Sequence, residues 1–168
     1  MEKRYLYINQ EVVKRYLNYD EKTGVFTRKV SITNSVKVGD IAGTLSCGYI
    51  YISLCGIRYR AHRLAWLYVY GNMPSCEIDH INRNKLDNRI DNLRLCNISQ
   101  NAHNTKIRSD NHSGIRGVSW SKALKKWHAR INVNKKFYHI GYFNNKEDAA
   151  REYKRYSQHL MGDFEIPE

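Results

Sequence analysis

Residues 76–104, CEIDHINRNKLDNRIDNLRLCNISQNAHN, decide how this chain is interpreted. Asp79 and His80 directly follow an apolar residue, and four asparagines lie between positions 82 and 92. If residues 77–80 form a strand, its alternation directs Asp79 and His80 to opposite faces, so that a metal ligand and a base can work side by side. The segment therefore predicts a polar site at the end of a strand.

The rest of the segment predicts a returning strand at residues 93–95 and a short helix capped by Ser99, which carries Asn101 and Asn104. Folded back, this helix would bring the Asn101 amide oxygen near Asp79. A carboxylate and an amide oxygen are hard ligands of the kind that Mg²⁺ accepts while it keeps waters and phosphate.

Other interpretations compete with a catalytic site. The Asp79-His80 pair can be an ordinary surface or capped-turn pair, and the asparagines can serve turns through hydrogen bonds from side chain to backbone. A structural zinc site is conceivable, but its spacing is poor; its four ligands would be Cys76, His80, Cys96 and His103. His62 is expected to be a packed or hydrogen-bonded histidine and not a second base.

Composition favours a polyanionic partner. The chain has 168 residues, a formal net charge of +12 and 42% hydrophobic residues, which predicts a folded protein that gains free energy by displacing counterions from phosphates. Its charge is +6 over residues 1–74, zero over 75–104 and +6 over 105–168. No apolar run of membrane length and no signal-peptide core are present, so we set a membrane aside. No protein partner is implied.

The four cysteines show no C-x-x-C spacing, so the sequence contains neither a zinc-ribbon motif nor a redox motif. Without an export signal, reduced and buried thiols are expected in a cytoplasmic protein. The flanking segments read as small elements: a helix over 10–17, Gly-bounded strands at 24–26 and 48–54, and a helix after Arg60 that ends at Gly71.

Beyond a polar linker, strict alternation in residues 127–134, WHARINVN, predicts a strand with apolar and polar faces. Lys135-Lys136 predicts a turn into the strand FYHIGYF, and residues 114–120 predict an earlier strand. The period becomes helical after Asn145, the expected N-cap, and Gly162 is expected to end that helix.

The segment AHRLAWLYVYGNMPSCEIDHINRNKLDNRIDNLRLCNISQNAHN resembles the HNH endonuclease family with a His-Me finger, or ββα-metal, site, particularly the form in phage and intron homing endonucleases. The D-H, N-L and Q-N pairs occur in the family's order. The resemblance implies Asp79 as a metal ligand, His80 as the general base, Asn92 as the asparagine that braces the loop, and Asn101 as the second ligand. Other members have histidine at the last position, so Asn101 favours Mg²⁺ or Mn²⁺ over zinc.

Residues 114–164 resemble the APETALA2-type DNA-binding domain, through G-x-R-G-V, K-W-x-A-x-I, I-G-Y-F and E-D-A-A-R-E-Y. The resemblance implies a three-stranded antiparallel sheet on one helix, with the sheet in the major groove. Residues 111–145 contain seven Lys and Arg and no acidic residue, which agrees with contacts to phosphates and base edges. The expected contact residues are Arg116, Lys126, His128, Arg130, Asn132, Lys136 and His139.

Arginines of plant members are absent at Ser119, Asn132 and Phe137, so the plant base preference does not transfer. A solvated face without a partner is the alternative for these basic residues.

The expected fold is α+β: a β-rich region at 1–58, an HNH nuclease core at 59–104, a linker at 105–113 and a DNA-binding domain at 114–168. The expected function is a metal-dependent endonuclease of the homing type that cuts double-stranded DNA and leaves 5′-phosphate and 3′-hydroxyl ends. The rivals are a non-catalytic DNA-binding regulator with a degenerate nuclease fold, and a structure-specific or RNA-directed nuclease. The resemblance also points to phage or intron origin.

Overall fold

The structure is a computed structural model that describes residues 8–31, 33–105, 107 and 109–161. The chain forms two compact units, Met1–Leu95 and Cys96–Glu168. Each unit has its own core and is described by itself below.

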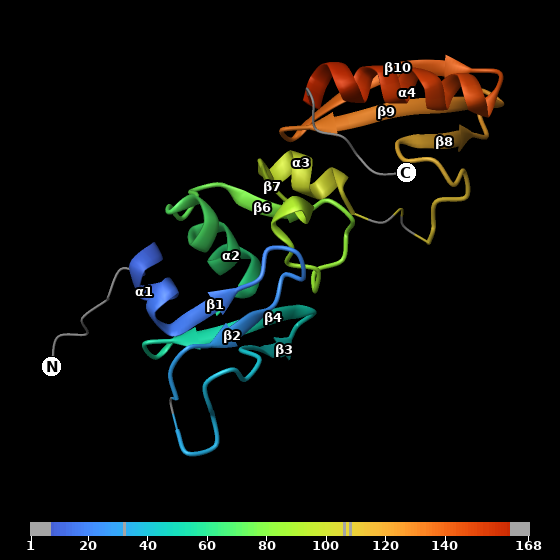
Figure 1. The fold of residues 1–168 in the computed structure, drawn as a ribbon. Helices are drawn as coiled ribbons and strands as arrows, with labels where there is room; N and C mark the ends of the chain where they lie inside the picture. Colours follow the sequence, from blue (N-terminus) through green and yellow to red (C-terminus); the bar gives the residue numbers. More distant parts are fainter. Residues whose placement is uncertain (1–7, 32, 106, 108, 162–168) are drawn as a thin grey trace, which may run out of the picture. The chain divides into compact units, whose positions relative to one another are not determined.

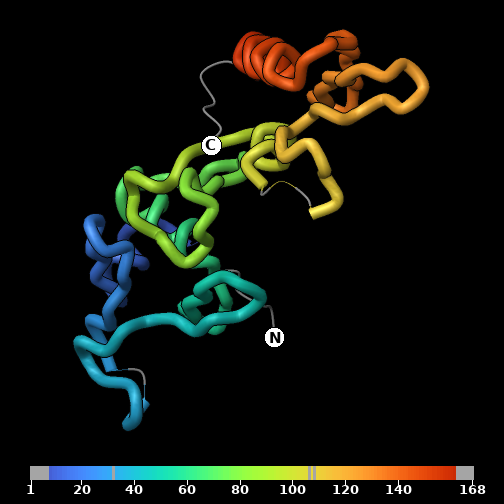
Figure 2. The backbone as a smooth tube through the Cα atoms, turned by 90° about the vertical axis from the view of Figure 1, so that its right-hand side faces the viewer, coloured from blue at the N-terminus to red at the C-terminus, as the bar shows by residue number. Residues whose placement is uncertain are grey.

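The first unit begins with helix α1, Gln10–Tyr16, whose N-cap Asn9 accepts a hydrogen bond from the Val12 amide at 2.9 Å. The predicted helix over 10–17 is therefore confirmed, one residue shorter. Two short antiparallel strands follow, β1 (Leu17–Tyr19) and β2 (Phe26–Arg28). Residues 33–38 extend away from them in both views (Figures 1 and 2).

A three-stranded antiparallel sheet follows, in the order β3 (Thr44–Ser46), β4 (Tyr49–Leu54) and β5 (Ile57–Arg60). Alternation along β4 gives the sheet two unlike faces, because Ile52 and Leu54 are buried while Tyr49 and Tyr51 lie on the opposite side. The predicted strand at 48–54 is confirmed.

Helix α2, Ala61–Tyr70, starts directly after β5. It ends at Gly71, which adopts a left-handed conformation (φ 80°) that suits glycine, and whose amide donates to the Leu67 carbonyl. Leu64, Ala65 and Leu67 are almost completely buried, so the predicted helix and its C-cap are confirmed.

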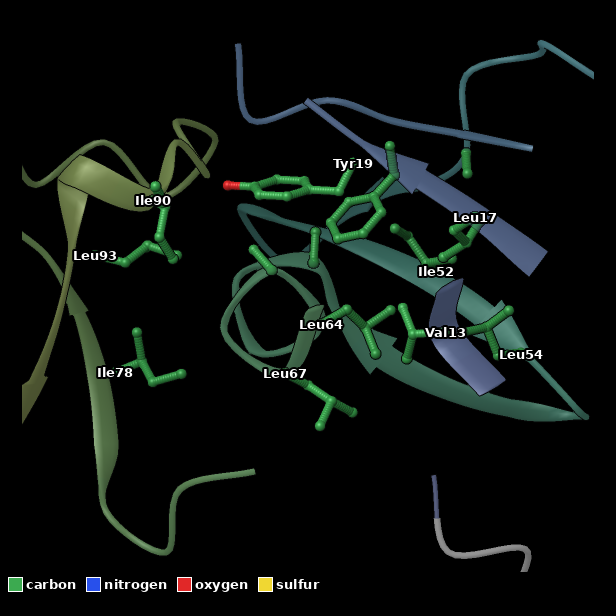
Figure 3. Close-up of a cluster of buried hydrophobic side chains, with 14 residues drawn as sticks. Val13, Leu17, Tyr19, Ile52, Leu54, Leu64, Leu67, Ile78, Ile90 and Leu93 are labelled. Carbon is green, nitrogen blue, oxygen red and sulfur yellow. The ribbon is translucent and has the colours of Figure 1, made fainter. Parts of the chain in front are cut away.

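The core of the first unit joins α1, α2, β4 and the site segment. Figure 3 shows Val13, Leu64 and Ile52 gathered between these elements, while the Tyr19 hydroxyl points toward the segment that carries Ile90. That hydroxyl donates a 2.6 Å hydrogen bond to the Asn88 carbonyl. The core thereby supports the loop that follows His80.

Strands β6 (Glu77–His80) and β7 (Leu93–Cys96) form a two-stranded sheet, and the 3-10 turn η1 (Ile90–Asn92) precedes β7. Both strands were predicted at these positions. Ile78, Ile90 and Leu93 belong to the core of the first unit, which anchors both ends of the intervening loop.

The second unit begins with helix α3, Ile98–His103. Its N-cap is Asn97 and not the predicted Ser99: the Asn97 side chain accepts from the Gln100 amide at 2.8 Å, and the Gln100 side chain accepts from the Asn97 amide at 2.9 Å. This reciprocal capping box satisfies two donors at the helix start. The Ser99 hydroxyl instead accepts from the Asn134 amide at 3.0 Å.

Strands β8 (Val118–Ser121), β9 (Lys126–Val133) and β10 (Lys136–Phe143) form an antiparallel sheet with β9 in the centre, and helix α4 (Lys146–Met161) packs along it (Figure 1). Ala129, Ile131 and Val133 pack with Ala149 and Tyr153 of the helix. The alternation predicted for 127–134 is confirmed.

The turn between β9 and β10 differs from the prediction, and the predicted end of α4 lies outside the described residues. The turn consists of Asn134 and Lys135, both with positive φ, so Lys136 is the first residue of β10 and not part of the turn. Asn145 precedes α4 as predicted, whereas Gly162, expected to end α4, lies outside the described residues.

Small antiparallel sheets with helices agree with the predicted α+β class. The division after Leu95 falls inside the predicted core at 59–104, because α3 is bonded to the C-terminal sheet and α4. The domain boundaries drawn from the sequence stay predictions. Among the described residues, no helix combines the length and apolar character needed to cross a membrane.

Candidate functional site

Strand β6 carries Asp79 and His80 into a buried position. The two residues are 6% and 5% exposed, and Ile78 before them anchors the strand in the core. Neighbouring residues of a strand point to opposite faces, so the two side chains meet different partners. Both residues were predicted from the sequence.

Asp79 is paired with a cation of the returning strand. Its Oδ2 accepts hydrogen bonds from Nε of Arg94, at 3.0 Å, and its salt bridge to Nη2 of Arg94 is also 3.0 Å long. Both nitrogens of Arg94 meet the same oxygen, and this contact orients the buried carboxylate. A carboxylate oxygen is a hard donor that suits Mg²⁺ or Mn²⁺.

His80 is held by an asparagine that the sequence analysis did not single out. Nε2 of His80 lies 3.3 Å from Oδ1 of Asn88, which is 1% exposed and whose amide nitrogen donates to the Leu86 carbonyl at 3.2 Å. An amide oxygen only accepts, so this contact assigns the proton to Nε2 and makes Nδ1 the basic nitrogen.

Burial lowers the pKa of His80, and this outweighs the opposing effects of the Asn88 hydrogen bond and the Asp79 charge. The charge of Lys85 lowers it further. The imidazole is therefore neutral near pH 7, the form that can accept a proton.

The loop between the strands is tied together by asparagine side chains. Oδ1 of Asn92 accepts from the Asn82 amide at 3.0 Å, and its Nδ2 donates to the Asp87 carbonyl at 2.8 Å. Asn82 and Asn84 accept from amides two residues later, at 2.8 and 3.1 Å. The asparagines thus form turns, as the plainer interpretation holds, and Asn92 spans the loop that carries Asn88.

Asp87 in this loop is neutralised locally. Arg89 donates to both of its carboxylate oxygens, at 2.8 and 2.7 Å, and lowers the pKa of Asp87 to about 2. Asn82 donates to the same carboxylate at 2.7 Å. The acid therefore supports the turn.

A second histidine lies against His80. The ring centroids of His62 and His80 are 4.9 Å apart in an edge-on arrangement, and His62 is 3% exposed. Burial, then the charges of His80, Arg60 and Arg63, lower the pKa of His62 to about 3. The prediction that His62 is a packed histidine is confirmed by this burial.

Tyr49 completes this aromatic group, with its ring centroid 5.6 Å from that of His62 and 6.3 Å from that of His80. Sequence reasoning missed Tyr49 and Asn88, since they lie 31 residues before and eight residues after His80. In the sequence Asn88 is only one of four asparagines between positions 82 and 92, and its burial is known from the structure.

Asn101 lies half-buried on α3 in the second unit. In that unit α3 is bonded to the sheet and to α4: Nε2 of His103 lies 2.7 Å from the Asn132 carbonyl, and Gln100 donates to the Met161 carbonyl at 3.2 Å. The pairing of Asn101 with Asp79 in one metal site stays a prediction. Across the described ranges, no three side chains of His, Cys, Asp or Glu gather as a metal cluster.

The face of the C-terminal sheet opposite α4 brings together four of the predicted contact residues. His128, Arg130 and Asn132 alternate with the buried residues of β9, and His139 is the register partner of Arg130. Antiparallel partners project to the same face. Nε2 of His128 and Nδ1 of His139 are 2.9 Å apart.

Tyr142 joins this face, although alternation from His139 predicts the opposite one. A register shift between His139 and Gly141 inserts one residue into β10 and makes Tyr142 the partner of His128, whose ring it stacks on at 4.8 Å. Phe137, 72% exposed, is the partner of Asn132 on the same face. Neither aromatic residue is among the contact residues predicted from the sequence.

Of the other three predicted contact residues, Lys126 lies at the end of this face, and Arg116 and Lys136 lie off it. Arg116 precedes β8, where its guanidinium donates to the Thr105 carbonyl. Lys126 begins β9 with the alternation of the polar face, opposite Ser121. Lys136 begins β10 opposite Val133, whose side chain belongs to the core face.

Two viral proteins are similar to this chain in sequence. Protein 3.8 of Escherichia phage T7 is 37% identical over 78 residues, which are 46% of this chain and 64% of that protein. Uncharacterized HNH endonuclease L560 of Acanthamoeba polyphaga mimivirus is 33% identical over 112 residues, 66% of this chain and 57% of that protein. The chain thus spans less than two thirds of either relative.

No solved structure matches the chain significantly. The sequence profile of the HNH endonuclease family matches residues 59–103, which contain Asp79, His80, Asn88 and Asn92. Together with the viral relative that bears the same family name, this match supports the assignment of residues 59–103 to the HNH endonuclease family.

Proposed function

We propose that this protein is a metal-dependent DNA endonuclease of the HNH homing type, which hydrolyses phosphodiester bonds and leaves 5′-phosphate and 3′-hydroxyl ends. One observation carries the proposal. Inside the segment that matches the HNH endonuclease family, a buried Asp79–His80 pair ends β6, and the Asn88 amide holds the histidine ring.

His80 is the general base of the proposed reaction. Its burial lowers its pKa and keeps the ring neutral near pH 7, so that Nδ1 can take a proton from the attacking water. The Asn88 contact at Nε2 orients the ring for this transfer. A positioned base of this kind contributes about 10²- to 10⁴-fold in rate.

Asp79 and Asn101 would hold the divalent cation, Mg²⁺ or Mn²⁺. Their carboxylate and amide oxygens are hard donors, and the 6% exposure of Asp79 limits competition from water. When bound, the cation supplies positive charge against the negative charge that grows on the phosphate and on the leaving 3′ oxygen.

The second unit would serve as an APETALA2-type domain that binds double-stranded DNA. The polar face of its sheet presents Arg130, Asn132 and the His128–His139 pair without acidic neighbours on β9 and β10. Arg130 in the middle of β9 suits a guanine edge in the major groove. Lys126, Lys136 and Arg116 are proposed phosphate contacts.

A non-catalytic DNA-binding regulator is the second candidate. The Arg94–Asp79 ion pair favours it, because that pair could satisfy the carboxylate in a purely structural role. Such a protein would bind DNA and cut none in any metal.

Plasmid cleavage tests the choice. The full chain, incubated with supercoiled plasmid and Mg²⁺ or Mn²⁺, is expected to nick or linearise it, and a chelator is expected to stop the reaction. His80→Ala should lose at least about 10² in rate with little change in DNA affinity. His159→Ala, an exposed histidine of α4, is the matched control. DNA binding without cleavage in either metal would instead establish the regulator.

Asp79→Ala and Asn101→Ala separately test the two ligands. Each should raise the Mg²⁺ concentration for half-maximal cleavage, because Mg²⁺ gives up its waters reluctantly and has few protein ligands. An unchanged metal titration in both variants would reject the pairing.

A further inference from the structure

Two cations and an aromatic ring adjoin His80 in the first unit and have no part in the mechanism above. The guanidinium carbon of Arg60 lies 4.5 Å from the Tyr49 ring centroid, and Nζ of Lys85 lies 4.7 Å from the same centroid. The Tyr49 ring is in turn 6.3 Å from the His80 ring. Two positive charges thus converge on one ring beside the general base.

The three residues come from separate parts of the first unit. Tyr49 begins β4, Arg60 ends β5 and Lys85 lies in the loop after β6. A tyrosine face attracts cations through its quadrupole, with about 0.5–1 kcal/mol at exposed sites. That attraction does not neutralise either charge.

Neither cation forms one of the salt bridges to a carboxylate. Within the described part of the chain, the salt bridges do not include Arg60 or Lys85. The loop acid Asp87, which could have paired with Lys85, is taken by Arg89. The hydrogen bond to the Tyr51 hydroxyl is the largest cause that raises the pKa of Arg60, and Glu77 adds to it only through its charge, without a salt bridge.

Arg60 is also oriented. Its Nε donates to the Tyr51 hydroxyl at 3.3 Å, which fixes one edge of the guanidinium, and its two Nη groups carry the other donors. The next pair along the strands repeats the pattern, with Arg58 over the Tyr51 ring at 4.7 Å. This face of the sheet is therefore basic and aromatic.

We propose that Arg60, Tyr49 and Lys85 form a binding site for a backbone phosphate of the DNA strand that is cut. This inference rests on the proposed function and assigns it a substrate contact. A fork-shaped guanidinium and a mobile ammonium complement the oxygens of one phosphodiester. The site then holds the strand so that the neighbouring phosphodiester lies at His80.

Lys85 and His80 both lie beside the Tyr49 ring: Nζ of Lys85 is 4.7 Å and the His80 ring centroid 6.3 Å from the Tyr49 centroid. A phosphate bound between Arg60 and Lys85 places one negative charge against two positive ones, which favours binding over free solution.

The test is a salt titration of DNA binding by the full chain in chelator, where no cutting occurs. Lys85→Met nearly keeps the length of the side chain and removes its charge. Arg60→Gln removes the charge of the guanidinium and also shortens the side chain. The loss of a phosphate contact should make the slope of log K against log salt shallower by about 0.9 for B-form DNA. Relative to the wild type, the variant then loses about 3.5-fold more affinity at low salt than at a salt concentration four times higher.

Lys14→Met is the matched control, because it also removes a lysine held over a tyrosine ring, Tyr68, at 5.2 Å. It should leave the slope at the wild-type value. Lys85→Arg should restore the slope, which a merely structural role of the lysine would not require. Lys85 is exposed in its loop, so Lys85→Met tests the site even if Arg60→Gln fails to fold.

A second arm locates the contact. Once the cut position is mapped, single phosphates around it are replaced by uncharged methylphosphonates. At one position, the methylphosphonate should weaken DNA binding by the wild type but should not weaken the binding by Lys85→Met any further. Wild-type slopes in Lys85→Met and Arg60→Gln, or an equal loss in Lys14→Met, would overturn this site while cleavage by the wild type keeps the proposed function. A wild type that neither binds nor cuts DNA would remove both.

Discussion

Replacement of Asn92 by alanine tests whether the site loop is held by one side chain. Asn92 is 6% exposed, and its amide makes two hydrogen bonds across the loop, of 3.0 Å to the Asn82 amide and 2.8 Å to the Asp87 carbonyl. A hydrogen bond contributes about 0.5–1.5 kcal/mol net, so Asn92→Ala should lower the free energy of unfolding by about 1–3 kcal/mol.

The same change should slow cleavage. The loop carries Asn88, which holds the His80 ring at 3.3 Å, and a shift of about 1 Å in a reacting group costs about 10²-fold in rate. Asn92→Asp keeps the acceptor and loses the donor, so its effect should be intermediate. Asn84→Ala, which removes one exposed turn hydrogen bond, is the matched control and should cost less than about 1 kcal/mol.

The measurements are urea unfolding, read by circular dichroism, and plasmid cleavage under matched Mg²⁺. If the free energy of unfolding of Asn92→Ala stays within about 0.5 kcal/mol of wild type, the loop is not held by this side chain. If stability falls and cleavage keeps the wild-type rate, the link from the loop to the His80 ring is wrong.

Three further predictions concern stability and DNA readout. The pKa of His62 is about 3 in the folded chain and near 6.5 in the unfolded chain, so the unfolded chain binds more protons between these pH values. The contribution of His62 to the free energy of unfolding is therefore complete above pH 6.5. Below pH 6.5 it declines by up to about 1.4 kcal/mol per pH unit. Urea unfolding at pH 7.5, 6.5 and 5.5 should show a shallower decline for His62→Gln, and an identical decline would refute the assignment. Gly24→Ala should lower the free energy of unfolding by at least about 1–2 kcal/mol, measured by heat or urea, because φ is +73° and a Cβ would lie 2.5 Å from backbone atoms of the site loop. Gly39→Ala is the control: its φ is +90° and a Cβ would meet no atom within 4 Å, so it adds only backbone strain and should cost less. Arg130→Ala should cost about 1–3 kcal/mol of binding free energy at the cognate site and relax the preference at one base pair. Lys136→Ala should weaken binding to all sequences alike and reduce the slope of log K against log salt by about 0.9. If titrations on cognate and scrambled duplexes show equal losses for Arg130→Ala, the sheet does not read bases.

Features set by neighbours along the chain could be predicted from the sequence. The alternation of β9, the helical spacing and glycine cap of α2, and the strands on either side of the site loop depend on periods of two or 3.6 residues, and the structure contains each of them. The match to the HNH endonuclease family likewise covers the segment in which the D-H pair was recognised.

Local errors arose where two residues could satisfy the same rule. Asn97 and Ser99 are both good N-caps, and the capping box with Gln100 decided for Asn97. The extra residue between His139 and Gly141 places Tyr142 on the polar face, and no rule along the chain predicts this, because a bulge breaks the period of two.

Only the tertiary structure brought Tyr49, His62 and Asn88 to His80, and placed Arg60 and Lys85 over one ring. These residues lie on different strands, a helix and a loop, so no period along the chain relates them. Their meeting depends on how β4, α2 and β6 pack around the core of the first unit, and such packing is decided by the shapes and burial of many side chains at once. The sequence by itself determined which local elements carry the Asp79–His80 pair, and packing decided the buried environment that lowers the pKa of His80 and keeps its ring neutral near pH 7.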